Sequence, residues 1–150
     1  MRSLSILAIT FLFSSHSFSQ SLAGEWKGGF NHGDYLFRPT PFALHISLNK
    51  DSTYRIYSYS WFESTGETVV SDVSYKMIST DSIWLEETKQ VKPKKKTGCP
   101  QRFFLALKTK DGKMMMEGTW SMVPGKDCDR AMGTVFLARS DAGVPTEIPN

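Results

Sequence analysis

The sequence predicts an all-β fold, an eight-stranded antiparallel barrel in which each strand pairs with the next along the chain. Eight short segments alternate apolar and polar residues or are rich in β-branched and aromatic residues, and turn residues separate them. No stretch shows a helical period of useful length. An even number of strands lets the last pair with the first, which removes the free edges that promote aggregation. A two-sheet sandwich is the alternative, but the unbroken order of neighbouring hairpins favours this up-and-down (meander) β-barrel.

Residues 1–19 are predicted to be a signal peptide. Arg2 supplies a positive charge, residues 4–13 are apolar, and small serines stand at the −3 and −1 positions before cleavage at Gln20. The apolar run is too short for a membrane anchor, which needs about 18–20 residues. No Cys lies near the cleavage site, which argues against a lipid-anchored protein. We therefore expect a secreted or periplasmic protein that does not span a membrane, with residues 20–150 as one domain.

The predicted strands are residues 22–30, 42–48, 52–62, 67–78, 83–88, 102–108, 114–122 and 131–139. The first contains Gly24-Glu25-Trp26, in which the glycine permits a tight bend while the large indole turns inward. Residues 31–41 form the longest connection of the first half, and their Gly, Asp and two Pro residues prevent a regular element. Long loops in compact domains tend to cover binding sites, so this loop is a predicted lid.

The later strands follow from alternation and turn chemistry. The second strand has an apolar residue at every other position from Phe42 to Leu48, and a turn at 49–51 joins it to the aromatic third strand. Gly66 precedes the fourth strand, and a second turn leads to the fifth. Asp111-Gly112 is a hairpin signal between the sixth and seventh strands. After the eighth strand, a tail at 140–150 should be loosely held.

The two cysteines, Cys99 and Cys128, both lie among turn residues of the predicted domain. An isolated pair in the loops of an exported protein most often forms a disulfide. This bridge would stabilise the fold by about 3–4 kcal/mol in the chain-entropy model. A metal pair or a redox thiol is the alternative, but two cysteines without a neighbouring His make a poor metal site.

Charge gives little indication of a partner. Of the 18 Lys and Arg residues only Arg2 lies in the first 20, which leaves 17 against 15 Asp and Glu. This small excess does not indicate nucleic acid. Four lysines cluster in the loop after the fifth strand: Lys92, Lys94, Lys95 and Lys96. They lack interleaved aromatic residues that stack on bases, so the loop is either simply solvated or makes weak contacts with anionic surfaces.

No catalytic or metal-binding constellation is evident, so we expect neither enzyme activity nor a cofactor. Beyond the signal peptide the chain has only His32 and His45, separated by the predicted lid, and two residues do not make a site. Glu86 and Glu87 are adjacent carboxylates of the kind used by glycosidases. Neighbouring strand residues point to opposite faces, so these two cannot act on one bond together.

The pattern resembles the calycin group, which includes lipocalins, fatty-acid-binding proteins and avidin-like barrels. The likeness consists of Gly24-x-Trp26 in the first strand, the eight-stranded order, and Arg139 at the end of the last strand. Gly118-Thr119-Trp120 is similar to the repeated segments of avidin-like barrels. The resemblance implies a lipocalin-like barrel whose closed end has Arg139 packed over Trp26, a cation–π contact worth about 0.5–2 kcal/mol.

The excess of aromatic residues and methionine is the best functional signal. Soft methionines and flat aromatic rings suit an adaptable apolar pocket, although they suit a packed core equally well. The candidate ligand-wall residues are Tyr57, Tyr59, Trp61, Phe104 and Met116. The leading hypothesis is a non-enzymatic barrel that binds a small apolar or amphipathic molecule entering past residues 31–41. The alternative is a filled barrel that acts through its surface, as an envelope or extracellular protein-interaction or inhibitor module.

Overall fold

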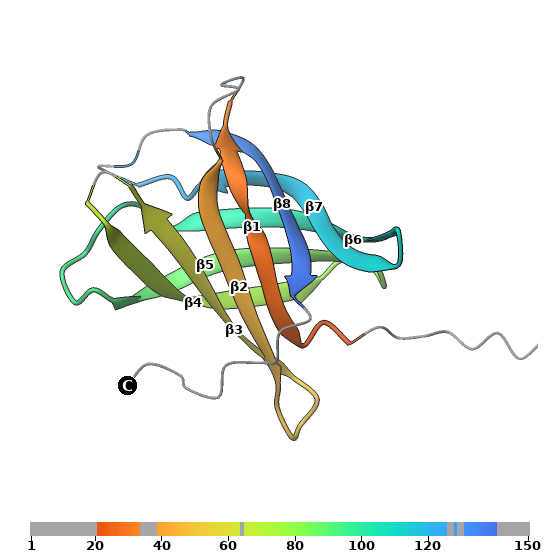
Figure 1. The fold of residues 1–150 in the computed structure, drawn as a ribbon. Coiled ribbons are helices and arrows are strands. Elements are labelled where there is room, and N and C mark those ends of the chain that lie inside the picture. The colour runs from red at the N-terminus through yellow and green to blue at the C-terminus, as the bar shows by residue number, and fades with distance from the viewer. Residues whose placement is uncertain (1–20, 34–38, 64, 126–127, 129–130, 141–150) are drawn as a thin grey trace, which may run out of the picture.

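A computed structural model describes residues 21–33, 39–63, 65–125, 128 and 131–140, which form a closed eight-stranded barrel (Figure 1). The strands are β1 Gly24–His32, β2 Thr40–Leu48, β3 Tyr54–Phe62, β4 Glu67–Met77, β5 Ser82–Lys92, β6 Gln101–Lys110, β7 Lys113–Met122 and β8 Met132–Ser140. Each strand is antiparallel to the next, and β8 pairs back onto β1. The predicted meander barrel is therefore confirmed, and the sandwich is excluded.

Three predictions fall at least partly outside the described residues. These are the signal peptide at 1–19, the tail beyond residue 140, and the lid, of which residues 34–38 are not described. Within the described ranges, no helix is long and apolar enough to cross a membrane.

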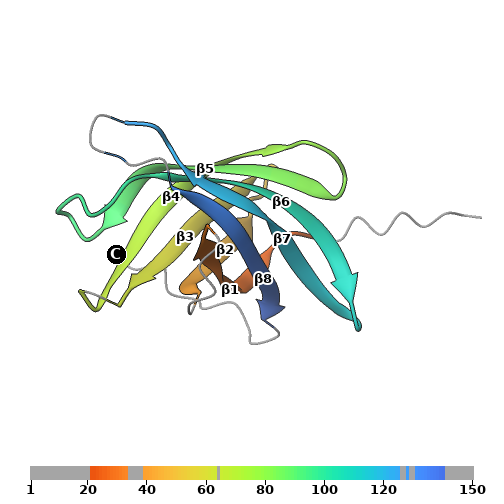
Figure 2. The same ribbon diagram turned by 90° about the horizontal axis from the view of Figure 1, so that it is seen from above.

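The strand predictions were accurate to within about two residues except for β5, which continues to Lys92 instead of ending at 88. The half of β5 beyond Glu86 pairs only with β4, up to the pair Val70 and Lys92. The register of this pairing shifts twice, between Val70 and Ser71 and between Asp72 and Val73. Figure 2 shows the connection between β5 and β6 projecting from one end of the barrel. The irregular pairing carries β5 outward beyond the regular wall.

The barrel interior is packed with apolar side chains contributed by all eight strands. Alternate residues along each strand point inward, as the pleat requires. The buried hydrophobic cluster consists of Leu22, Trp26, Phe30, Phe42, Leu44, Ile46, Ile56, Val73, Ile83, Leu85, Phe103, Leu105, Met116, Trp120, Val135 and Leu137. An eight-stranded barrel is just wide enough for side chains to fill. These residues occupy the space in which an apolar ligand of a hollow barrel would lie.

Trp26 and Arg139 are cross-strand partners at one end of the barrel. The guanidinium of Arg139 donates hydrogen bonds to the carbonyl oxygens of Ser21 (3.3 Å) and Ala23 (2.7 Å). Gly24 has a φ of 141°, and a Cβ on it would lie 3.1 Å from Arg139 Nε. No cation–π contact joins these two described residues, because the guanidinium packs over Gly24 and ties down the main chain before β1.

The opposite end contains a cluster of aromatic side chains. Phe30 lies 4.7 Å from Trp120 and 5.8 Å from Phe42 between ring centroids, and Phe42 stacks on Phe103 at 4.8 Å. The indole N–H of Trp120 donates to the carbonyl oxygen of Asn31 at 2.8 Å, which satisfies its only donor. This cluster fills the β1, β2, β6 and β7 side of that end.

Close approach of neighbouring strands is made possible by glycine at inward positions. A Cβ on Gly118 of β7 would lie 1.8 Å from the carbonyl oxygen of Phe104 in β6. Gly28 and Gly133 occupy equally tight positions elsewhere in the barrel. The barrel's curvature therefore depends on residues without a side chain at these points.

Candidate functional site

The barrel wall opens where β5 and β6 stop pairing. Their last paired residues are Glu86 and Arg102, although β5 continues to Lys92. The chain returns to the barrel through residues 93–100 before β6 starts at Gln101. The space between the far half of β5 and this connection is a pocket of about 330 Å³, which we call the β5–β6 pocket. Its lining residues are Ser71, Glu87, Thr88, Lys89, Gln90, Lys94, Lys96, Thr97, Gly98, Cys99 and Pro100.

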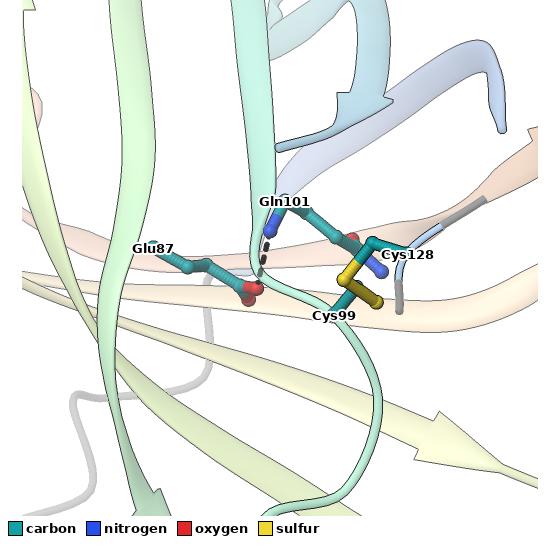
Figure 3. The surroundings of a disulfide bond; sticks show 4 residues. All are labelled: Glu87, Cys99, Gln101 and Cys128. Atoms are coloured by element: carbon teal, nitrogen blue, oxygen red, sulfur yellow. Dashed lines mark hydrogen bonds between the residues drawn. A yellow bond between two sulfur atoms is a disulfide. The ribbon is translucent and has the colours of Figure 1, made fainter. Parts of the chain in front are cut away.

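Glu87 is the inward-facing carboxylate of this pocket. Its register partner on β4 is the core residue Val73, so its side chain points into the barrel. Oε1 accepts a hydrogen bond from the hydroxyl of Ser58 at 2.5 Å, and Oε2 accepts one from the backbone N–H of Gln101 at 2.9 Å. Figure 3 shows the carboxylate directed at the start of β6, while the side chain of Gln101 extends away from it.

Burial raises the pKa of the Glu87 carboxyl, and the hydrogen bonds from Ser58 and Gln101 offset part of that rise. Each carboxylate oxygen can accept more than one hydrogen bond. Glu87 therefore retains acceptor capacity for a further donor inside the pocket.

Polar residues take inward positions around Glu87 on three neighbouring strands. Ser58 and Ser60 of β3, Ser71 of β4 and Gln101 of β6 are all buried. The Ser60 hydroxyl and the Gln101 side-chain oxygen are buried without a hydrogen-bond partner. Unsatisfied buried polar atoms are costly and uncommon. This side of the barrel interior is therefore polar, in contrast to the aromatic side.

The connection that forms the outer wall of the pocket is held by Gln90. The amide of Gln90 donates to the carbonyl oxygens of Pro93 and Lys95, the latter at 2.8 Å, and accepts the backbone N–H of Thr97 at 2.8 Å. A single inward-facing side chain thus organises a loop in which neither a helix nor a strand is present.

The Cys99–Cys128 disulfide holds the same connection from its other end. The bridge joins residues 29 apart, as predicted, and ties the β5–β6 connection to the segment between β7 and β8 (Figure 3). Cys99 is itself a lining residue. The disulfide is confirmed, and it stabilises one wall of the pocket as well as the fold.

The predicted lysine cluster divides into two groups. Lys94 and Lys96 are exposed and line the pocket, whereas Lys92 and Lys95 do not belong to its lining. None of the four forms an ion pair with a described residue. The pocket consequently has a carboxylate inside and ammonium groups at its rim.

Three of the predicted ligand-wall residues point away from the barrel interior, although Tyr57 is buried on that face beneath Arg55. On β3 the even-numbered residues from Ile56 to Ser60 are buried and point inward, so Tyr57, Tyr59 and Trp61 point outward. The prediction chose the wrong face because a period of two separates the faces of a strand without stating which is inside. The aromatic face appeared to be the interior one, but β3 turns its serines toward Glu87 instead.

The other two predicted wall residues are also separated. Phe104 lies outside between the buried residues Phe103 and Leu105, while Met116 is fully buried in the core. The structure therefore does not bring the five residues together at one site. The barrel-closure residues Gly24, Trp26 and Arg139, in contrast, do meet at one end.

The titratable residues considered from sequence lie at separate places in the described part of the barrel. In the described part of the chain, no three His, Cys, Asp or Glu side chains are grouped for metal binding. His32 contacts Trp120 edge-on at 4.9 Å. Glu86 and Glu87 point to opposite faces, with Glu86 paired to Arg102 at 3.3 Å on the outside. The alternation of strand residues predicted this separation, but no sequence pattern indicated that Glu87 would lie in a pocket.

Comparison with known proteins identifies no relative. No family model matches the chain, and no curated protein or solved structure gives a significant match. The closed eight-stranded architecture therefore rests on the strand order and closure described above.

Proposed function

We propose that the protein is a non-enzymatic binding protein for a small polar molecule held in the β5–β6 pocket. The observation that carries the proposal is the distribution of charge, with Glu87 inside and Lys94 and Lys96 at the rim. A complementary ligand has a cationic or hydrogen-bond-donating group directed inward and an anionic group directed outward. Small zwitterions, with the size of an amino acid, meet both requirements.

The pocket's size supports a small ligand. Its volume of about 330 Å³ is at the lower end of the range of roughly 300–1,000 Å³ found for small-molecule sites. Apolar side chains of the described core, such as Trp26, Phe103 and Met116, occupy the barrel axis. A fatty acid therefore fits this barrel less well than a compact polar molecule.

Export is part of the proposal. The Cys99–Cys128 bridge is typical of oxidising compartments, and residues 1–19 have the composition of a signal peptide. We propose that the protein acts in a periplasmic or extracellular space, where it binds its ligand without transforming it.

The test is a thermal-shift and calorimetric screen of the twenty amino acids, small organic acids and small amines. Binding at 100 times the dissociation constant raises stability by about 2.7 kcal/mol. We expect zwitterions to raise the melting temperature, and we expect acids or amines alone to raise it less. Glu87→Gln should reduce the affinity, as should the double change of Lys94 and Lys96 to Ser.

The matched control changes Lys92 and Lys95 to Ser in the same connection. This variant removes the same charge but leaves the pocket lining intact. Equal loss of binding in the two double variants would show only a diffuse charge effect. Absence of any binding in the screen would refute the proposed pocket function.

A second candidate function is interaction through the surface of a filled barrel. The buried cluster of sixteen apolar residues favours it. Exposed apolar side chains on the outer wall, including Phe104 and Met132, are available for such contacts.

A further inference from the structure

A groove of about 610 Å³ lies on the outer wall of the barrel, over β5, β6, β7 and β8. Its lining residues are Gly33, Trp84, Arg102, Phe103, Phe104, Thr119, Trp120, Ser121, Met132, Gly133 and Thr134. The groove shares no lining residue with the β5–β6 pocket. It is therefore a separate site.

The strand register arranges the groove as two rows of outward-facing residues. One row runs Trp84, Phe104, Thr119, Thr134 across the four strands. The other runs Arg102, Ser121, Met132, and Glu86 of β5 lies beside Arg102 at the edge of the lining. The β7 members of both rows, Thr119 and Ser121, are shorter than their neighbours on β6. The hollow therefore follows β7, with hydroxyl groups along its floor.

One wall of the groove presents aromatic surface. Trp84 and Phe104 are directly paired across β5 and β6. Phe104 is 47% exposed, and Met132 on the other side of the groove is 65% exposed. Exposed apolar side chains that form a contiguous patch with a polar rim are typical of interaction sites.

Beside the aromatic pair lies an ion pair that offers donors and acceptors together. Arg102 contacts Glu86 at 3.3 Å, and both side chains remain partly exposed. The Nε atom of Arg102 is buried without a hydrogen-bond partner, so the exposed part of the guanidinium is what the groove presents. The guanidinium and the carboxylate balance each other in charge, so the row has strong hydrogen-bonding capacity without a net charge.

We propose that this groove binds a neutral oligosaccharide. A sugar ring has an apolar C–H face that stacks on flat aromatic side chains and a rim of hydroxyls that both donate and accept hydrogen bonds. Trp84 and Phe104 supply the stacking surface, and Thr119, Ser121 and the Arg102–Glu86 pair supply the polar partners.

The same lining disfavours other occupants. A purely apolar partner would cover the hydroxyls of the floor without offering them hydrogen bonds, which is costly. A strongly anionic partner would meet Glu86, and a strongly cationic one would meet Arg102. A neutral molecule with both apolar and hydroxylated surfaces satisfies all of these groups.

The experiment is calorimetric titration of the purified chain with cellohexaose, maltohexaose and N-acetylchitohexaose. We expect at least one of them to bind, with affinity reduced at least tenfold by Phe104→Ala and by Trp84→Ala. Phe136→Ala is the matched control, because Phe136 is an outward aromatic residue of β8, 39% exposed, that does not line the groove. Circular dichroism confirms that each variant retains the barrel.

Three results would overturn the proposal. These are no binding of any of the three hexasaccharides, equal weakening by Phe104→Ala and Phe136→Ala, and self-association in sedimentation experiments that Phe104→Ala abolishes. The last result would assign the groove to a second copy of the chain. Hexasaccharide binding that is unchanged when Lys94 and Lys96 are replaced by Ser would show that this groove is distinct from the β5–β6 pocket.

Discussion

The carboxylate of Glu87 accepts the backbone N–H of Gln101 at 2.9 Å, directly beyond the last backbone pairing of β5 with β6. The Glu87 side chain thereby continues the link between β5 and β6 by one residue after the backbone hydrogen bonds end. The same carboxylate accepts a hydrogen bond from the Ser58 hydroxyl of β3, on the far side of β4. One partly buried acid thus connects three strands at the point where the wall opens.

Glu87 should make stability depend on pH. Burial raises the pKa of its carboxyl above the ordinary value of 4.5. At pH values between the unfolded-state pKa of 4.5 and the higher pKa in the folded protein, the folded protein binds more protons than the unfolded chain. The free energy of unfolding therefore falls as pH rises between these two pKa values. Glu87→Gln removes this dependence. Urea denaturation at several pH values above about 4.5 measures the slope.

Glu117→Gln is the control for the pH experiment. The hydrogen bond and charge of Lys108 lower the pKa of Glu117, so its titration lies below the window of Glu87. The slope above about pH 4.5 should therefore be unchanged in this variant. An identical slope in Glu87→Gln and the native protein would contradict the assignment.

Removal of the Cys99–Cys128 bridge should destabilise the protein and loosen the outer wall of the β5–β6 pocket. The double change to Ser opens a loop of 29 residues, which costs about 3–4 kcal/mol in the chain-entropy model. Denaturant melts measure the loss, and non-reducing peptide mapping confirms the bridge in the native protein. Unchanged stability would mean that the bridge contributes nothing to the native fold.

Arg139→Ala should weaken closure of the Trp26 end. It removes two charge-assisted hydrogen bonds to Ser21 and Ala23, and we expect a loss of about 2 kcal/mol. Arg55→Ala is the control, because Arg55 is more than half exposed and its contact with Asp72 is 3.7 Å long. Surface pairs of this kind contribute about 0–1 kcal/mol. Equal effects of the two variants in urea denaturation would argue against a special role for Arg139.

Gly118→Ala should be severely destabilising. The new Cβ would lie 1.8 Å from the Phe104 carbonyl oxygen, so β6 and β7 must move apart. We expect a cost of at least about 3 kcal/mol, which is typical of overpacking at a site that cannot relax. Gly125→Ala is a suitable comparison, because its Cβ would meet only Cys128, at 3.4 Å or more. In thermal melts, Gly118→Ala should lower the melting temperature much more than Gly125→Ala does.

Much of the barrel could be predicted because the sequence signals are local. The alternation of Phe42 to Leu48 and the turn at Asp111-Gly112 depend on neighbouring residues, and both appear as predicted in β2 and in the β6–β7 hairpin. The cysteine pair was recognisable from its spacing and turn context. The failure came on β3, where Ile56, Ser58 and Ser60 face the barrel interior and the aromatic residues of the other face point outward.

The sequence by itself determined the strand count, the meander order and the disulfide, since each follows from residue type and spacing along the chain. Only the tertiary structure decided which face of β3 is inside and where the wall opens. Those features depend on register across several strands. Glu87, Ser58 and Gln101 are 14 to 43 residues apart in sequence, and no local pattern indicates that they meet. Trp84 and Phe104 likewise form one outer surface only because β5 and β6 pair in this register.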